Sequence, residues 1–193
     1  MKLCQNEFKA MNHPLRRFSQ RRIEYPLFKR MGLAGSCMRI LEIGCGSGYG
    51  AGLMRDLKPT RYVGVDIMPE QIALAKRRGL PNCDFRVLDA TDLCCFEDGS
   101  FDVIVIFGIL HHIPTWRRVL AEARRLLVPG GRMFLEEPDG RVISAWDKIF
   151  KWGHPVKGFI LPELEGEVER VGLRIKQKKK IAGFGVYSLQ RGP

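Results

Sequence analysis

The sequence predicts an α/β fold, in which a doubly wound, mostly parallel sheet carries helices on both faces. Short apolar segments alternate with segments of helical periodicity along most of the 193 residues. The first apolar segment breaks into the glycine cluster Gly44–Gly50, as happens where a buried parallel strand turns tightly into a helix. The last two apolar segments follow each other without a helix between them, which predicts a terminal hairpin.

Length and composition favour one globular domain over residues 1–193, because 45% of the residues are hydrophobic. The longest apolar run, near Val103–Leu110, is too short to cross a bilayer, and residues 1–14 contain no apolar signal-peptide core. No transmembrane segment is therefore expected. Six cysteines without a C-x-x-C pair indicate reduced thiols and a cytoplasmic location.

The formal net charge of +11 favours a nucleic acid, an anionic membrane surface or an acidic substrate as partner. The alternative is a solvated basic surface that only keeps the protein dispersed. Residues 1–36 carry much of this charge and are expected to form a helical extension, with Pro14 beginning a helix and Pro26 bending it. Its apolar residues recur at helical spacing: Leu15, Phe18, Ile23, Leu27 and Phe28. We expect this extension either to cover the ligand site as a lid or to pack on the sheet edge.

The first three strands are predicted at the places where apolar runs meet turn residues. Each of the second and third ends on an acid, Asp66 and Asp89. The predicted strands are Ile40–Ile43, Arg61–Asp66 and Cys83–Leu88, and the helices that separate them are Gly50–Leu57 and Pro69–Arg78.

The fourth predicted strand, Phe101–Phe107, is the most apolar and is expected at the sheet centre. A helix over Trp116–Leu127, stopped by Val128–Gly131, leads to a fifth strand at Arg132–Glu136 and then to an acidic turn, Glu136–Gly140. The remaining predicted elements are helices at Val142–Lys151 and Pro162–Val171 and strands at Leu173–Lys180 and Ala182–Leu189.

The glycine cluster predicts a nucleotide-like ligand. Glycine permits unusual φ values and close approach to the backbone, and the amides of the following helix favour negative charge. Asp66 lies about twenty residues further on, the distance at which an acid takes a ribose hydroxyl pair; the alternative is that it caps the next helix. Because Gly46–Ala51 also fits the relaxed G-x-G-x-x-A pattern, an NAD(P)-dependent oxidoreductase is a second interpretation.

Four segments, in order along the chain, resemble the motifs of the class I S-adenosylmethionine-dependent methyltransferases: Leu41–Gly48, Val63–Asp66, Val87–Ala90 and Phe101–Ile113. The resemblance implies a Rossmann-like core over residues 37–193, a seven-stranded sheet with an antiparallel last strand, and S-adenosyl-L-methionine as cofactor. The residues that it assigns to the cofactor are Gly44, Gly46 and Gly48 at the methionine part, Glu42 near the amino end, Asp66 at the ribose, Ile67 beside the adenine, Asp89 and Ala90 at the adenine edge, and Phe107 and Gly108 at the tip of the fourth strand.

The stretch Gly108–Ile113 looks most like family members that methylate small molecules, and the Asn-Pro-Pro-Tyr kind of motif is absent. The implied enzyme transfers a methyl group in line to such an acceptor, and a base is needed only where the acceptor loses a proton. His111 and His112 are the candidates for that base; the alternative is a pair that packs a loop. A zinc site made from them and Cys94–Cys95 has poor ligand geometry, so no metal is expected. A methyltransferase-like binding module without catalysis is a third interpretation.

Overall fold

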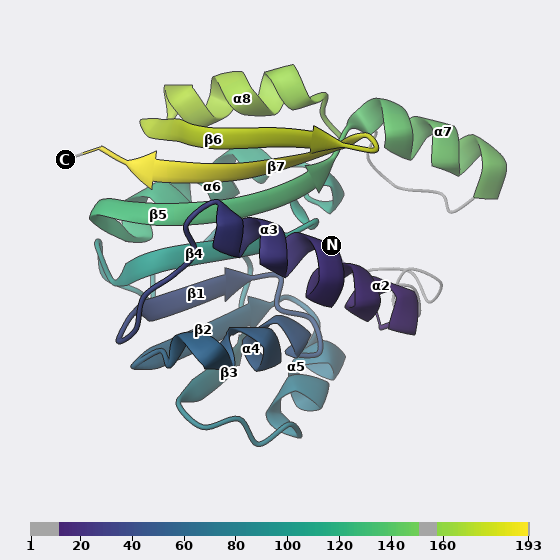
Figure 1. Cartoon of the computed structure of the whole chain (residues 1–193). Coiled ribbons are helices and arrows are strands. Elements are labelled where there is room, and N and C mark those ends of the chain that lie inside the picture. The colour runs from purple at the N-terminus through teal and green to yellow at the C-terminus, as the bar shows by residue number, and fades with distance from the viewer. Residues whose placement is uncertain (1–11, 151–157, 193) are drawn as a thin grey trace.

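A computed structural model describes residues 12–150 and 158–192 and contains the predicted sheet between two layers of helices (Figure 1). The strand order is β3-β2-β1-β4-β5-β7-β6. Neighbours from β3 to β5 are parallel, whereas β7 runs antiparallel to both β5 and β6. The seven strands are β1 (Arg39–Ile43), β2 (Arg61–Asp66), β3 (Cys83–Val87), β4 (Phe101–Phe107), β5 (Leu127–Pro138), β6 (Leu173–Ile181) and β7 (Phe184–Arg191). The predicted doubly wound, mostly parallel sheet is confirmed.

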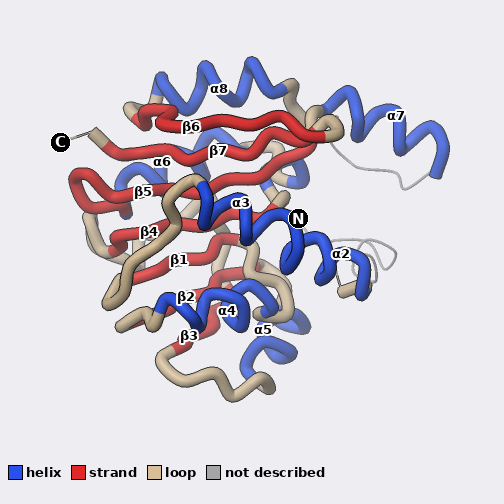
Figure 2. The backbone as a smooth tube through the Cα atoms, in the orientation of Figure 1, coloured by secondary structure: helices blue, strands red, loops and turns tan. Residues whose placement is uncertain are grey.

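The helices cover both faces of this sheet (Figure 2). Side chains of α3, α4 and α5 share one core cluster, and those of α6 and α8 share the other. The helical elements are α2 (Pro14–Ser19), a π-turn η1 (Gln20–Glu24), α3 (Tyr25–Arg30), α4 (Tyr49–Leu53), η2 (Met54–Leu57), α5 (Pro69–Lys76), η3 (Leu110–His112), α6 (Trp116–Leu126), α7 (Gly140–Phe150) and α8 (Leu161–Arg170). Within the two described ranges, no helix has both the length and the apolar content that a bilayer crossing requires.

Strand β4 lies fourth of seven, which confirms the prediction that the most apolar strand forms the sheet centre. Its side chains alternate between the two clusters: Ile104 and Ile106 face α6, while Val103, Val105 and Phe107 face α3. Full burial of each such side chain contributes about 1.5–3 kcal/mol. The core therefore fixes the position of the β4 tip, next to which the site lies.

Strand β5 differs from the prediction at both of its ends. Leu127 already pairs with Phe101, and the register then jumps to Arg132 opposite Val103, so the Pro-Gly-Gly stretch loops out within the strand. The acidic turn predicted for Glu136–Gly140 is wrong, because Glu136 is buried inside the strand together with its neighbours to position 138. Partners far away in the sequence, described below, hold these carboxylates.

The N-terminal segment divides into two parts with opposite burial. In α3, Leu27 and Phe28 are buried, and the ring of Phe28 stacks on that of Phe107 at 5.1 Å. In α2 and η1 the apolar residues Leu15, Phe18 and Ile23 are exposed. A single apolar side facing the protein is therefore wrong for this segment. Only its second half packs on the sheet, while α2 lies at the carboxyl end of the strands (Figure 1).

Candidate functional site

The glycine loop between β1 and α4 is tied to the end of β2 by backbone hydrogen bonds. The N–H groups of Gly44 and Cys45 donate to the Val65 carbonyl at 2.8 and 3.0 Å. The N–H of Gly46 donates to Asp66 Oδ2 at 3.0 Å. Gly44, Gly46 and Gly48 have φ values of +74°, +49° and +72°, a region that side chains with a Cβ disfavour. The loop thus holds a conformation that depends on its glycines.

The three glycines differ in the space around the position that a Cβ would occupy. A Cβ on Gly44 would lie 2.7 Å from the Ile109 side chain, and one on Gly48 would lie 3.0 Å from the Cβ of Ala75. The nearest atom to a Cβ on Gly46 is Gln71 Oε1, at 3.9 Å. Two of the glycines therefore permit close packing, whereas Gly46 borders open space.

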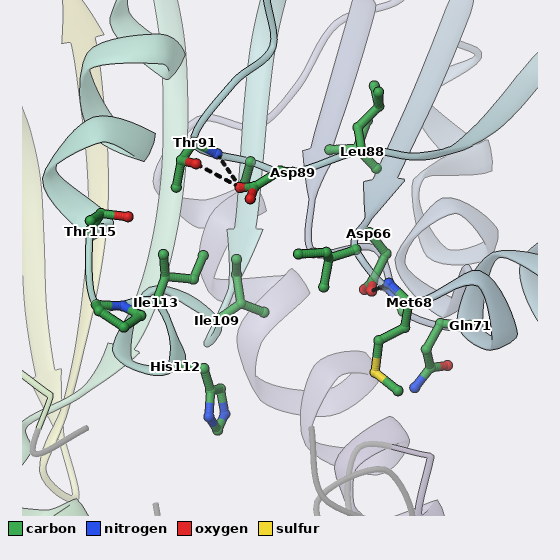
Figure 3. A pocket seen from close by; sticks show the side chains of 16 residues that line it. Asp66, Met68, Gln71, Leu88, Asp89, Thr91, Ile109, His112, Ile113 and Thr115 are labelled. Atoms are coloured by element: carbon green, nitrogen blue, oxygen red, sulfur yellow. Dashed lines mark hydrogen bonds between the residues drawn. The ribbon is translucent and has the colours of Figure 1, made fainter. Parts of the chain in front are cut away.

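That open space is a pocket at the carboxyl ends of β1, β2 and β3, closed on the far side by the segment after β4 (Figure 3). The predicted site residues that line it are Gly44, Gly46, Asp66, Ile67, Asp89, Ala90 and His112. Other lining residues, which the sequence did not single out, are Met68, Gln71, Leu88, Thr91, Ile109, Ile113 and Thr115. Met68, Thr91 and Ile109 lie within three residues after a predicted strand end, and this position is the signal by which they could have been found.

Asp66 stands at the tip of β2 and holds the loops around it. Its Oδ1 accepts the N–H of Met68 at 2.9 Å, and its Oδ2 accepts the N–H of Gly46. Burial raises the pKa of this carboxyl, and the backbone N–H groups oppose that effect. Since Met68 is the N-cap residue of α5, the carboxylate also supports the start of that helix, and the two predicted roles do not exclude each other.

Asp89 follows the neighbouring strand β3 and lies at the rim of the pocket between Asp66 and the segment after β4 (Figure 3). Its Oδ1 accepts the N–H of Thr91 at 2.8 Å and the hydroxyl of Thr91 at 2.7 Å. This local turn fixes the carboxylate at the pocket edge although the residue is exposed. Ala90, beside it, is half-buried.

Glu42 lies behind the glycine loop and does not line the pocket. It is 2% exposed and accepts a hydrogen bond from the Tyr62 hydroxyl. Burial, with a contribution from the charge of Asp66, raises the pKa of Glu42 to about 8. A Cβ on Gly50 would overlap Glu42 Oε1, so Gly50, which the sequence did not single out, makes room for the carboxyl group.

Phe107 and Gly108, at the tip of β4, also lie outside the lining of this pocket. The N–H of Gly108 donates to the Glu136 carbonyl at 2.8 Å. The Phe107 carbonyl accepts from the Arg16 guanidinium at 3.2 Å. Arg16, in α2, also pairs with Glu24 and lies 3.6 Å from Glu136 Oε2. The N-terminal segment thus reaches the end of β4 through an arginine.

The two histidines of η3 have different surroundings. His112 lines the pocket, whereas His111 is buried with its Nδ1 2.8 Å from Glu137 Oε2. Glu137 is fully buried and also accepts the N–H groups of Ile109, Leu110 and His111. Because these bonds fix the turn, the His111 ring is held against the His112 ring at 4.0 Å between centroids. Glu137, predicted in a turn, is therefore a positioning residue that the sequence missed.

The cysteines Cys94 and Cys95 are exposed. In the part of the chain that the structure describes, no three His, Cys, Asp or Glu side chains gather as a metal site would need. The pocket contains instead two carboxylates, apolar side chains and backbone amides, which suit an organic ligand that combines hydroxyl groups with a flat ring.

Comparisons with known proteins find a matching family model and similar chains. Residues 41–135 match the family model described as Methyltransferase domain. The phthiotriol/phenolphthiotriol dimycocerosates methyltransferase 1 of Mycobacterium ulcerans is 38% identical over 135 residues, covering 68% of this chain and 49% of that protein. The ubiquinone biosynthesis O-methyltransferase of Xanthomonas oryzae pv. oryzae is 34% identical over 125 residues, covering 63% and 51%. The chain spans about half the length of these curated relatives.

A solved structure described as an S-adenosylmethionine-dependent methyltransferase from Aquifex aeolicus is similar with a TM-score of 0.77. The similarity covers 97% of this chain and 99% of that one at 19% identity, which establishes a shared fold. The matched segment 41–135 contains the glycine loop, the two strand-tip acids and the paired histidines. Residues 41–135 thus carry the methyltransferase domain of this family model, and the fold is shared with a protein described as an S-adenosylmethionine-dependent methyltransferase.

Proposed function

We propose that the chain transfers a methyl group from S-adenosyl-L-methionine to a small-molecule acceptor. The observation that carries this proposal is the convergence of Gly46, Asp66 and Asp89 on one pocket, from three different strand tips. The family resemblance implies that all three residues contact one cofactor. A ligand in contact with all three needs a polar group for each carboxylate and a flat part for the apolar wall.

The lining of the pocket is chemically suited to an adenosyl group. Gly46 leaves space where any side chain would intrude. Ile67, Leu88 and Ile113 offer an apolar surface to a purine ring. Asp66 is suited to the sugar hydroxyls and Asp89 to the amino edge of the base, because carboxylates accept hydrogen bonds from both. Glu42 lies outside this lining, where it accepts a hydrogen bond from the Tyr62 hydroxyl.

When bound, the cofactor supplies an activated methyl group, so the chain does not need to provide a nucleophile. Its part is to hold an acceptor in line, an effect worth about 7–11 kcal/mol. Where the acceptor has a proton to lose, His112 is the proposed base, because it lines the pocket. His111 and Glu137 act through it by fixing the turn that carries it.

The acceptor class rests on the sequence and on the relatives. The Gly108–Ile113 stretch is similar to that of small-molecule methyltransferases. The relatives have names that refer to dimycocerosates and to ubiquinone biosynthesis, and neither name refers to a nucleic acid or a protein. We therefore propose a small organic acceptor that enters from the carboxyl edge of the sheet.

The sheet topology favours this proposal over an NAD(P)-dependent oxidoreductase. Dinucleotide-binding sheets of the 3-2-1-4-5-6 order bind their ligand across two equivalent halves. In this chain the place beyond β5 is taken by the antiparallel strand β7, and β6 lies at the edge. The second half therefore lacks the parallel pairing found in the first.

Thermal unfolding in the presence of S-adenosylhomocysteine, and separately of NAD, tests the proposal. We expect the homocysteine compound to raise the midpoint, by mass action on the folded state, and NAD to leave it unchanged. The reverse result would support the oxidoreductase. Stabilisation without release of S-adenosylhomocysteine, across a broad panel of phenol, quinol and lipid acceptors, would support the binding module.

A further inference from the structure

The outer surface of the N-terminal segment has an unusual distribution of polar and apolar side chains. Leu15, Phe18 and Ile23 are 71%, 61% and 47% exposed. In the same segment, Glu24 is 4% exposed and Arg16 is partly buried, and the two form an ion pair. An amphipathic helix on a protein surface normally buries its apolar side and exposes its charges. Here the Arg16–Glu24 ion pair faces the protein, and the three apolar side chains face solvent.

Polar contacts on the side that faces the protein attach this segment, so its apolar residues are not needed for packing. Arg16 donates to the Phe107 carbonyl at the β4 tip and pairs with Glu24, which also accepts from the Ser19 hydroxyl at 2.7 Å. The following helix α3 is anchored by Phe28, which is fully buried. The three exposed apolar side chains are thus free for another contact.

The charges of the segment indicate what that contact is. Between positions 13 and 30 the chain has six arginine or lysine residues and one acid, Glu24. Arg21 and Arg22 are exposed beside the apolar residues. Apolar side chains flanked by exposed arginines are the pattern of a helix that lies in the interface of an anionic bilayer. A protein partner with an apolar patch would not need the arginines, and a nucleic acid would not need the apolar side chains.

We propose that Leu15, Phe18 and Ile23, together with Arg21 and Arg22, form a docking surface for an anionic lipid bilayer. We name these five residues the outer surface. The apolar side chains enter the headgroup region, and the guanidinium groups contact lipid phosphates. Because Arg16 of the same segment bonds to the end of β4, docking brings the carboxyl edge of the sheet close to the bilayer.

Sedimentation with vesicles of phosphatidylcholine, with and without phosphatidylglycerol, tests this surface on the full chain. We expect binding to the anionic vesicles only, and weaker binding as the salt concentration rises. The variant Leu15→Ser/Phe18→Ser/Ile23→Ser should lose at least about tenfold in partitioning, since it removes the buried apolar area. The variant Arg21→Gln/Arg22→Gln should lose about fivefold for each charge removed.

Matched controls carry the same changes elsewhere on the surface. Ile160→Ser/Ile181→Ser removes exposed apolar side chains, and Lys176→Gln/Lys179→Gln removes two exposed charges. Both should bind vesicles like the unchanged protein. All of the substituted side chains are exposed, so circular dichroism should report a folded protein in each case. As a second readout, Phe18→Trp should add fluorescence that a bilayer-embedded nitroxide lipid quenches.

The proposal is overturned if the unchanged protein ignores anionic vesicles or if the apolar variant binds them equally well. It is also overturned if the protein binds single-stranded RNA but not vesicles. A dimer that dissociates in the apolar variant, without vesicle binding, would likewise assign the surface to a second copy of this chain instead.

Discussion

At the scale of single residues, Glu42 combines full burial with an ionisable group. Its carboxyl is enclosed by the Tyr62 hydroxyl and by the space that Gly50 leaves, and its pKa is raised to about 8. The protonated form therefore prevails near neutral pH. The raised pKa results from the packing of Tyr62 and Gly50 around the carboxyl group, which cannot be predicted from the sequence alone.

We predict that Glu42 makes the folded state less stable as the pH rises from about 5 to about 8. In this range the folded protein keeps the proton while the unfolded chain, with a carboxyl near its ordinary pKa of 4.5, has released it. Unfolding thus releases a proton, and the free energy of unfolding falls by up to about 1.4 kcal/mol per pH unit. Urea unfolding of Glu42→Gln, which mimics the protonated group, should show a weaker decline. An equal slope for both proteins would contradict the assignment, and Glu97→Gln, an exposed site, is the control.

The histidines give a second prediction at this scale. His112→Ala should lower turnover by about 10²-fold for an acceptor that loses a proton, because that is the usual contribution of a positioned base. The affinity for S-adenosylhomocysteine should remain within a few-fold. His111→Ala should lower turnover and also stability, since Glu137 loses a buried partner. Unchanged turnover of His112→Ala would exclude it from the chemistry; the exposed His13→Ala is the control.

At the scale of elements, the positions of the strands were more predictable than the side-chain contacts between elements. The β4 boundaries, Phe101–Phe107, agree with the prediction residue for residue, because apolar content marks a buried central strand. The terminal hairpin is also confirmed, but its turn is at Ala182 and Gly183, where the second strand was expected to begin. These residues have φ values of +50° and +83°, which a two-residue turn between right-twisted strands needs.

The wrong predictions of burial, for Arg16 and for Glu137, have a common physical cause. Arg16 is turned inward by Glu24 and by the Phe107 carbonyl, and Glu137 is turned inward by the amides of η3. Most of these partners are distant in sequence, so local periodicity predicts the opposite burial. Because such partners are distant in sequence, the acids at the tips of β2 and β3 could be predicted, whereas the positioning role of Glu137 could not.

The glycine loop gives a prediction for an element. Gly46→Ala should cost about 1–2 kcal/mol of stability through its left-handed φ, and should weaken S-adenosylhomocysteine binding at least about tenfold by filling open space. Gly48→Ala adds overpacking against Ala75 and Phe85, worth about 1–3 kcal/mol more. The first variant should therefore lose mainly affinity and the second mainly stability. Calorimetry and urea unfolding measure both, and equal affinity of Gly46→Ala and the unchanged protein would contradict the assignment of Gly46.

The contacts that hold α2 on the protein give another prediction at this scale. Arg16→Met removes the side chain that bonds to Glu24 and to the Phe107 carbonyl. We expect chymotrypsin to cut faster after Phe18, because local opening of α2 becomes easier. The exposed Arg21→Met should be cut at the original rate. Equal rates for both variants would mean that Arg16 does not hold the segment.

At the scale of the whole molecule, the fold brings three strand tips to one edge and lays the N-terminal segment beside them. The mostly parallel sheet and the terminal hairpin were predictable, because alternation and turn residues are local signals, whereas the full strand order was not predicted. The outward-facing apolar side chains of α2 and η1 were not predictable. Their exposure depends on the contacts that Arg16 and Glu24 make on the other side of the segment. The proposed cofactor site and the proposed docking surface thus lie at the same edge of the sheet.

The central claim is that the tips of β1, β2 and β3 form one cradle for an adenosyl group. Calorimetric titration with S-adenosylhomocysteine tests it most directly on three proteins: the unchanged chain, Asp89→Ala, and Asp84→Ala as a control on the same strand, where Asp84 pairs with Arg86 away from the pocket. We predict tight binding to the unchanged chain and to Asp84→Ala, and binding at least about tenfold weaker to Asp89→Ala. No binding heat with the unchanged, folded chain, or equal affinity in all three proteins, would contradict the account.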